Sequence, residues 1–186
     1  MSANGVDSSE ESWTVLRMIL WSADYLADKG VSSSRLDAEH LLAHVVGVGR
    51  LQLYLEFERP LSRSELDGFR PLLKRRAARE PLQYIVGRQP FRELDLEVCP
   101  GVLIPRPETE VLVDVIHEWT EAAAPVNPVA LDIGTGSGAI GLSLAHEGYI
   151  THVTATDIME VALEVARRNR DAAELVDKVD LRWGSL

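Results

Sequence analysis

Apolar residues recur about every three to four positions through residues 1–88, a spacing that predicts a small bundle of helices, each burying one face. The clearest run lies between Trp13 and Lys29. Ser12 can cap its first turn, and Gly30 can end the helix in a left-handed conformation. The predicted inward positions of this helix are Val15, Leu16, Ile19, Leu20, Ala23, Leu26 and Ala27.

A second helix is predicted from Arg35 to Val46, with Ser34 as its cap and Gly47 as its stop. Four apolar side chains of this helix are expected to face the interior of the bundle. They are Leu36, Leu41, Leu42 and Val45.

Three further signals complete the bundle. Ser62 and Glu65 have the spacing of a capping box, in which each side chain bonds the backbone N–H of the other residue, and so they open another helix. Pro71 is expected to kink or restart that helix, because proline has no N–H to donate. Pro81 then opens a short helix that Gly87 ends.

The period shortens beyond Gly87. From Leu94 to Val98 apolar and acidic residues alternate strictly, as in a half-buried strand. Cys99-Pro100-Gly101 supplies a turn, and Val102-Leu103-Ile104 is the predicted returning strand of a β-hairpin. Residues 89–107 are therefore interpreted as a hairpin followed by an interdomain loop.

Residues 108–186 read as part of a Rossmann-like domain. A helix begins near Glu108, and its predicted apolar face consists of Val111, Leu112, Val115, Ile116 and Trp119. Strands are then predicted at Val129–Ile133, His152–Thr156 and Val179–Trp183, with helices at Ala139–His146 and Glu160–Ala173 between them. Strands that alternate with helices predict a parallel sheet, so the fold class is α/β, with three parallel strands behind a helical domain.

The formal net charge of the 186 residues is −10, and it is unevenly placed. Residues 1–88 contain 12 basic and 12 acidic residues, whereas residues 89–186 contain 7 basic and 17 acidic ones. The acidic half would repel phosphates, which argues against a general nucleic-acid-binding protein. The neutral half has a basic run, which is either a solvated helix face or a contact for ribosomal RNA: Arg70, Lys74, Arg75, Arg76 and Arg79.

Nothing in the sequence indicates a membrane or an oxidising compartment. No apolar run reaches the roughly 18 residues of a membrane-spanning helix. Cys99 is the one cysteine, which rules out an intramolecular disulfide and fits a reducing cytoplasm. The five histidines and Cys99 show no spacing suited to zinc, so no metal site is expected.

The strongest chemical signal is a glycine loop between a buried strand and a helix, from Asp132 through Gly134, Thr135, Gly136 and Ser137 to Gly138. Glycines permit positive φ angles and let a ligand approach the backbone without a Cβ in the way. Asp132 would lie beside the positively charged amino-acid part of a ligand. Asp157 ends the second strand, where a carboxylate can accept hydrogen bonds from both hydroxyls of a ribose.

The glycines alone do not choose the cofactor. Gly136, Gly138 and Gly141 are a literal match to the dinucleotide fingerprint, so NAD is an alternative, as is a glycine turn that binds nothing. Two features favour S-adenosylmethionine. The acid just before the loop resembles motif I of methyltransferases, and the 128 residues before the first strand are unlike the short lead of an N-terminal dinucleotide fold.

Several longer motifs resemble one family, the PrmC/HemK release factor glutamine methyltransferases. Residues 35–42, Arg-Leu-Asp-Ala-Glu-His-Leu-Leu, resemble the signature of its second helix, and residues 80–87, Glu-Pro-Leu-Gln-Tyr-Ile-Val-Gly, its linker. Phe91 and residues 102–110, Val-Leu-Ile-Pro-Arg-Pro-Glu-Thr-Glu, resemble its interdomain hairpin and loop. The glycine loop and Asp157 match its cofactor site, so the resemblance covers nearly the whole chain.

The resemblance implies a function and a cofactor. Members of the family use S-adenosylmethionine to methylate N5 of the glutamine in the Gly-Gly-Gln motif of bacterial peptide-chain release factors. An amide nitrogen is a poor nucleophile, so the site must orient it, and positioning and electrostatics do most of the work. In the family an Asn-Pro-Pro-Tyr motif after the fourth strand performs this task. Here the only Asn-Pro pair is Asn127-Pro128, ahead of the glycine loop, so no catalytic residue is assigned in this chain.

The missing motif leads to two expectations. The chain is either a piece of a longer protein, the interpretation we favour, or a natural truncation that pairs with another chain, and in both cases it should be inactive alone. Its first sheet strand should be an unprotected edge, because the fourth strand would lie beside it, and such an edge predicts self-association.

Four residues are weaker candidates for the site. The resemblance places Arg106 and Glu108 in a loop that lines the cofactor and substrate cleft, although a hinge with a surface ion pair is the alternative. Phe91 would pack near the ligand or in the core. Leu186 occupies the place where methyltransferases contact adenine. Two other functions stay open, a nucleic-acid N-methyltransferase and a release-factor-binding module without chemistry.

Overall fold

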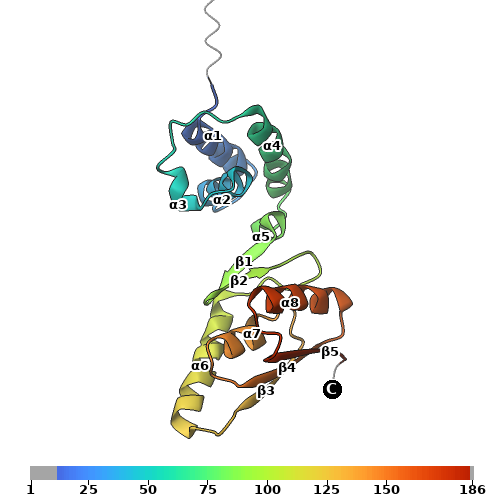
Figure 1. The fold of residues 1–186 in the computed structure, drawn as a ribbon. Helices are drawn as coiled ribbons and strands as arrows, with labels where there is room; N and C mark the ends of the chain where they lie inside the picture. The colour runs from blue at the N-terminus through green and yellow to red at the C-terminus, as the bar shows by residue number, and fades with distance from the viewer. Residues whose placement is uncertain (1–11, 185–186) are drawn as a thin grey trace, which may run out of the picture. The chain divides into compact units, whose positions relative to one another are not determined.

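A computed structural model describes residues 12–184, and the chain divides into two compact units, one ending at Val86 and one beginning at Gly87 (Figure 1). No helix within the described residues is both long and apolar enough to span a bilayer. The first unit is helical throughout. Its helices are α1 (Val15–Asp28), α2 (Ser34–Val46), α3 (Arg50–Leu53), α4 (Arg63–Ala77) and α5 (Leu82–Val86).

The first unit has a single apolar core into which α1, α2 and α4 all contribute. Its largest fully buried side chains are Phe69, Ile19, Leu26, Leu41, Leu42 and Leu53. The expected ends of two helices are confirmed, because Gly47 and Gly87 both adopt positive φ. The start of α1 was predicted wrongly. Its cap is Thr14, whose hydroxyl accepts from the Arg17 N–H at 3.3 Å, because Thr14 also pairs with Pro60 and so sets where the helix begins.

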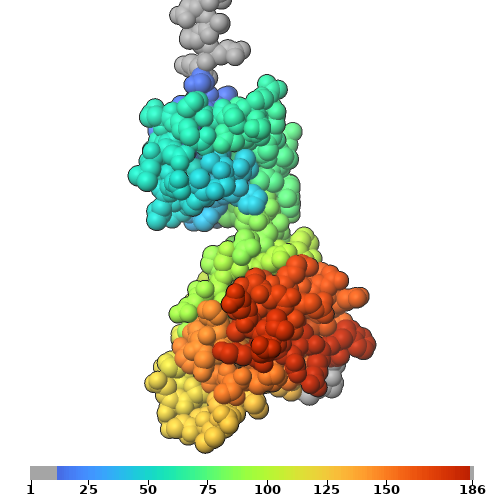
Figure 2. Space-filling model, viewed as in Figure 1, coloured from blue at the N-terminus to red at the C-terminus, as the bar shows by residue number. Residues whose placement is uncertain are grey.

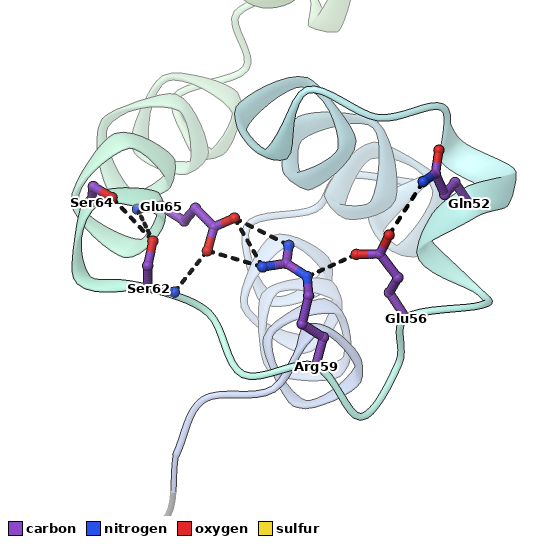
Figure 3. Close-up of polar contacts among 6 residues, drawn as sticks. All are labelled: Gln52, Glu56, Arg59, Ser62, Ser64 and Glu65. Carbon is purple, nitrogen blue, oxygen red and sulfur yellow. Dashed lines mark hydrogen bonds and ion pairs between the residues drawn. The ribbon is translucent and has the colours of Figure 1, made fainter.

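The capping box that opens α4 is confirmed. The Ser62 hydroxyl accepts from the Glu65 N–H at 3.2 Å, and the Glu65 carboxylate accepts from the Ser62 N–H at 2.7 Å (Figure 3). Arg59 donates to the same carboxylate and to Glu56, so it joins the loop before α4 to the first turn of that helix. Burial of the carboxyl raises the pKa of Glu65, but the hydrogen bonds from Ser62 and Arg59 outweigh it and leave that pKa lowered.

The expected break at Pro71 is wrong, because α4 continues through it. Pro71 is exposed, so the Asp67 carbonyl that loses its helical partner can bind water instead. Proline therefore costs this helix one hydrogen bond without interrupting it.

The inward face of α2 was also predicted wrongly at one position. Leu36 is 44% exposed, and carboxylates take buried positions on the helix instead. Asp37 pairs with Arg76 at 2.6 Å, and Glu39 accepts from Arg50 at 3.0 Å and from the Tyr54 hydroxyl at 2.9 Å. These bonds satisfy both buried charges, so the face of α2 that carries Asp37 and Glu39 lies in the interior although its sequence is polar. The helix begins at Ser34, and its cap position is held by Ser33, one residue earlier than expected.

The second unit contains two sheets. An antiparallel hairpin consists of β1 (Arg88–Phe91) and β2 (Leu94–Glu97). A parallel sheet has the order β3 (Val129–Ile133), β4 (His152–Asp157) and β5 (Val179–Trp183). Its helices are α6 (Pro107–Ala123), α7 (Ala139–His146) and α8 (Glu160–Ala172). In Figure 2 the red surface of α8 and β5 covers much of the visible side of this unit.

The hairpin is shifted along the chain from its predicted place. β2 pairs with residues 88–91 ahead of it, and Val102–Ile104 form no strand. The turn predicted at residues 99–101 is present, with the Val102 N–H donating to the Cys99 carbonyl at 3.1 Å. The hairpin connection is Arg92-Glu93, and Arg92 has a φ of 51°. This connection carries neither glycine nor asparagine, so the usual sequence signal of a tight hairpin is missing.

Arg92 is held in this conformation by acids from two helices. Its guanidinium makes a bidentate pair with Glu147 at 2.5 and 2.6 Å and bonds Asp114 at 2.6 Å. Its N–H donates to the Glu110 carboxylate at 3.1 Å. The side chains of Arg92 and Glu147 are only 15% and 7% exposed, and the pairing lowers the pKa of Glu147. One arginine therefore joins the hairpin, α6 and the end of α7.

One face of the parallel sheet is covered and the other is not. Val153, Ala155 and Val179 pack into a core with α7 and the hairpin. Val129, Leu131 and Ile133 point to the opposite face and are exposed, and β3 lies at one edge of the sheet, as the sequence predicted. On α6 the core-facing residues are Val113 and Ile116. Most of the predicted apolar face is instead exposed, namely Val111, Leu112, Val115 and Trp119.

We predict that Arg92→Met destabilises the second unit by about 3 kcal/mol, the low end for breaking a buried ion pair, because Glu147 is left charged and buried. Hydrogen exchange of α7 peptides by mass spectrometry measures this loss in the second unit alone. The matched control is Arg88→Met, since Arg88 and Asp95 form an exposed pair in the same hairpin. Its effect should stay within about 1 kcal/mol.

The same comparison has a defined pH dependence. The folded-state pKa of Glu147 lies below its ordinary value of 4.5, so its contribution is present above that value and is lost as the pH falls through the lowered pKa. The stability difference between the parent chain and Arg92→Met should therefore shrink in acid, measured by urea unfolding. A difference that stays constant down to about pH 3 would contradict the role given to Glu147.

Candidate functional site

The glycine loop joins β3 to α7 and is anchored on the end of β4. The backbone N–H groups of Gly134 and Thr135 both donate to the Thr156 carbonyl, at 2.8 and 2.9 Å. β3 and β4 are parallel and in register from Val129 opposite His152 to Ile133 opposite Thr156, so their carboxyl ends meet at this point. The loop is thus fixed at the edge where open parallel sheets bind their ligands.

Two of the loop glycines have distinct requirements. Gly136 has a φ of 58°, and an added Cβ would meet no atom within 4 Å, so the loop presents open backbone there. Gly138 has a φ of 85°, and a Cβ would lie 2.7 Å from the Leu142 Cδ1 atom. The first glycine leaves room for a ligand, whereas the second is needed for α7 to start close to the loop.

Asp157 lies under the loop at the end of β4, as the sequence predicted. Its side chain is fixed by two backbone donors, with Oδ2 accepting from the Gly136 N–H at 3.0 Å and Oδ1 from the Met159 N–H at 2.9 Å. The residue is 8% exposed. Each carboxylate oxygen has a second lone pair, so both can still accept a hydroxyl.

Asp132 holds the loop from the side of β3. Its Oδ2 atom accepts from the Thr135 hydroxyl at 2.8 Å and from the Gly141 N–H at 3.2 Å, which ties the strand end to the loop and to α7. The described contacts use only this oxygen, so Oδ1 is available to a ligand cation.

A small cavity of about 120 Å³ lies beside the loop. The segment before α6 closes one side of it with Leu103, Pro105 and Arg106, together with Thr109 of the helix itself, and the glycine loop with Asp132 forms the other. Ser137, whose residue is 2% exposed, has a buried hydroxyl without a hydrogen-bond partner among residues 12–184. The cavity is smaller than the roughly 300–1,000 Å³ of ligand pockets, so it can enclose only part of a nucleoside cofactor.

The structure brings together some of the weaker candidates and separates others. Arg106 lines the cavity with the glycine loop. Glu108 is exposed in the first turn of α6 and does not line it. Phe91 is 1% exposed and belongs to the core cluster that also contains Leu142. Leu186 lies outside the described residues.

Asn169 supports the loop and was missed from the sequence. Its side-chain N–H groups donate to the Ser137 carbonyl at 2.8 Å and to the Glu97 carbonyl at 3.0 Å, and its oxygen accepts from the Glu97 N–H at 2.7 Å. This residue of α8 therefore connects β2 with the glycine loop across 32 and 72 positions of sequence. A polar residue at the inner spacing of an amphipathic helix was the only available signal.

Exposed apolar groups beside Asp157 were also missed. Ile158 and Met159 follow the carboxylate and are exposed, and the Trp183 indole N–H donates to the Ile158 carbonyl at 3.1 Å. An apolar surface next to a ribose-binding carboxylate can pack against a nucleobase. The signal in the sequence was a pair of apolar residues directly after the acidic end of a strand.

Within residues 12–184 no group of three or more His, Cys, Asp or Glu side chains could hold a metal ion.

Comparison with known proteins assigns the two units to domain families. Residues 17–87 match the family described as PrmC N-terminal domain, and residues 108–186 match the methyltransferase small domain. The second unit is thus a Rossmann-like domain of the methyltransferase type. Among solved structures, the tRNA (uracil-54, C5)-methyltransferase of Pyrococcus abyssi in complex with S-adenosyl-L-homocysteine is 24% identical with a TM-score of 0.43, over 53% of this chain and 23% of that one.

The similar curated proteins are named release factor glutamine methyltransferases. The release factor glutamine methyltransferase of Geobacter sulfurreducens is 44% identical over 95% of this chain, and that of Rhodopirellula baltica is 40% identical over 96%. Over nearly its whole length the chain is therefore similar to release factor glutamine methyltransferases, and its first unit matches the PrmC N-terminal domain. It spans about 60% of the length of these relatives.

We predict that Asn169→Leu loosens the glycine loop. The substitution leaves the Glu97 N–H and the Ser137 carbonyl buried without partners, at about 1–3 kcal/mol for each group. Hydrogen exchange of the peptide that contains residues 134–139 should speed up, while Arg167→Ala, an exposed change on the same helix, should leave it unaltered. Unchanged exchange in Asn169→Leu would show that the loop holds its shape without this tether.

Proposed function

We propose that the second unit binds S-adenosylmethionine at the carboxyl ends of β3 and β4. The observation that supports this most strongly is the pairing of an open glycine loop with a fixed carboxylate. Gly136 leaves space for the ligand, and Asp157 is held by two backbone N–H groups with a free lone pair on each oxygen. When bound, the cofactor supplies an electrophilic methyl group.

The residues around the loop fit the parts of that cofactor. Asp157 would accept the two ribose hydroxyls, and Ile158 would pack against the base. Asp132 offers its unused oxygen to the ammonium group, and the unpartnered Ser137 hydroxyl and Arg106 line the cavity where the carboxylate end would lie. Gly134 and Thr135 line the same cavity and complete the cradle. Placing the adenine near Leu186 remains a prediction from the family resemblance.

NAD is the alternative ligand for the same loop. The literal dinucleotide match depends on Gly141, and this glycine has a packing role in the structure. A Cβ on Gly141 would lie 3.1 Å from both the Asp132 Oδ2 atom and the Val153 Cγ1 atom. Since this close packing accounts for the third glycine, the match gives no support to a dinucleotide, and the methyltransferase small domain favours S-adenosylmethionine.

We further propose that the protein takes part in N5-methylation of the Gly-Gly-Gln glutamine of bacterial release factors. The curated relatives are named release factor glutamine methyltransferases, which supports the substrate class. The 186 residues contain no Asn-Pro-Pro-Tyr sequence to orient the substrate amide, so this chain by itself should bind cofactor without transferring the methyl group. In this scheme residues 1–88 recognise the substrate, residues 89–107 connect, and residues 108–186 bind the cofactor.

Two further contacts remain proposals. Self-association through β3 is supported by its place at a sheet edge and by the exposed side chains Val129, Leu131 and Ile133. A contact of the Arg70–Arg79 run with ribosomal RNA has weaker support. Arg75 pairs with Glu80, Arg76 with Asp37, and Arg79 donates to the Gly30 carbonyl, so three of its five cations are already engaged within the unit.

We predict that S-adenosylmethionine binds this chain and that Asp157→Ala weakens binding about a hundredfold or more, because two hydroxyl contacts to a charged acceptor are lost at about 1.5 kcal/mol or more each. Isothermal calorimetry measures the affinity, and excess NAD should not compete. The matched control is Asp180→Ala, an exposed aspartate on β5 of the same sheet. Equal affinities for the parent chain and Asp157→Ala, or displacement by NAD, would refute the assignment.

A second measurement separates the function classes. We expect a release factor to bind this chain without acquiring a methyl group, whether or not S-adenosylmethionine is present, measured by pull-down and by mass spectrometry of the Gly-Gly-Gln peptide. Methyl transfer by the chain would show that residues within it orient the amide. Methyl transfer to a nucleic acid, without binding or methylation of a release factor, would favour the nucleic-acid N-methyltransferase alternative.

A further inference from the structure

The first unit contains an apolar groove that none of the functions above uses. It has a volume of about 470 Å³ and is lined by residues of α1 and α4 together with Trp13. Its floor consists of buried side chains, chiefly Met18, Phe69 and Leu73. Both the volume and the apolar lining are typical of sites that bind a ligand or a partner side chain.

An aromatic wall stands along the α1 side of the groove. Trp21 stacks on Tyr25 with ring centroids 5.5 Å apart and an interplanar angle of 3°, and it meets Trp13 edge to face at 5.9 Å. Although it is stacked, Trp21 remains 49% exposed. A large, rigid and half-exposed tryptophan over an apolar floor has the features of a protein-interaction hot spot.

The α4 side of the groove carries positive charge. Arg70 and Lys74 are four residues apart and therefore lie on the same side of the helix. The groove lining contains no carboxylate. Lys74 has no ion-pair partner among residues 12–184, and the one ion pair of Arg70, with Asp67, is long at 3.7 Å and exposed. These two cations are the members of the basic run that are not committed to strong contacts within the unit.

We propose that this groove binds an acidic segment of a protein partner that inserts a large apolar side chain between Trp21 and the floor. Carboxylates beside that side chain would pair with Arg70 and Lys74, which gives the complementarity of charge that selects partners. RNA is disfavoured, because two cations over an apolar floor supply few phosphate contacts, and the Trp21 and Tyr25 rings are already stacked on each other. The inference stands on the first unit alone and does not depend on cofactor binding.

A phage-displayed library of random peptides, selected on the full 186-residue chain, tests the proposal. We expect the enriched peptides to combine aspartate or glutamate with tryptophan, phenylalanine or leucine. A recovered peptide should bind Trp21→Ala about tenfold more weakly or worse, as for a hot-spot tryptophan. Lys74→Glu should also weaken binding several-fold, and raised salt should weaken the parent chain in the same direction.

Two control variants separate the groove from general stickiness. Trp119→Ala removes a tryptophan of similar exposure, 55%, from the other unit. Arg63→Glu reverses a charge on α4 outside the groove. Both should leave the affinity unchanged, and circular dichroism should show that every variant is folded.

Several outcomes would overturn the proposal. One is the absence of acidic apolar peptides from the selection, and another is equal affinity for Trp21→Ala. Tighter binding of a single-stranded RNA oligonucleotide, lost in Trp21→Ala, would make the groove a nucleic-acid site. Self-association abolished by Trp21→Ala in sedimentation would make a second copy the occupant. A large gain in peptide affinity on deleting residues 1–11, which include Asp7, Glu10 and Glu11, would assign the groove to the chain's own N-terminus.

Discussion

The candidate site depends on one constraint, that the backbone groups of a tight glycine loop must each find a hydrogen-bond partner. Thr156 accepts two N–H groups of the loop, Asp157 accepts a third, and Asp132 binds the loop threonine and the first turn of α7. Asn169 occupies the Ser137 carbonyl from the other side. Since these partners come from β3, β4 and α8, the loop can adopt its shape only when the sheet and helices are assembled. The carboxylates assigned to ligand binding therefore also build the site.

Much of the second unit could be predicted because local signals and global fold agree there. The three parallel strands alternate along the chain with helices, and their bounds differ from the prediction by no more than one residue. The acidic ends of β3 and β4 indicated which edge would carry the site. The tether through Asn169 could not be predicted, because it depends on a partner 72 residues away and leaves no periodic signal.

Two of the errors arose where long-range ion pairs override local preference. The hairpin turn lacks glycine because acids at 18, 22 and 55 residues' separation hold Arg92 in the left-handed conformation. In the first unit Asp37 and Glu39 lie in the interior because Arg76 and Arg50 accompany them, which turns Leu36 to solvent. Of the apolar face predicted for α6, only Ile116 meets the core, beside Val113, which was not predicted. Periodicity reports which residues could be buried and cannot report which of them has a partner.

Gly141 shows what a glycine pattern does and does not encode. The residue lies in the first turn of α7, where its N–H donates to Asp132, and an added Cβ would lie 3.1 Å from the Asp132 Oδ2 and Val153 Cγ1 atoms, so those side chains would have to shift for any larger residue. A glycine at this position indicates that the helix and the strand approach each other closely. The last glycine of a nucleotide fingerprint therefore reflects close packing of the helix on the sheet. Chains that bind quite different ligands will share this glycine whenever their first helix lies equally close to the sheet.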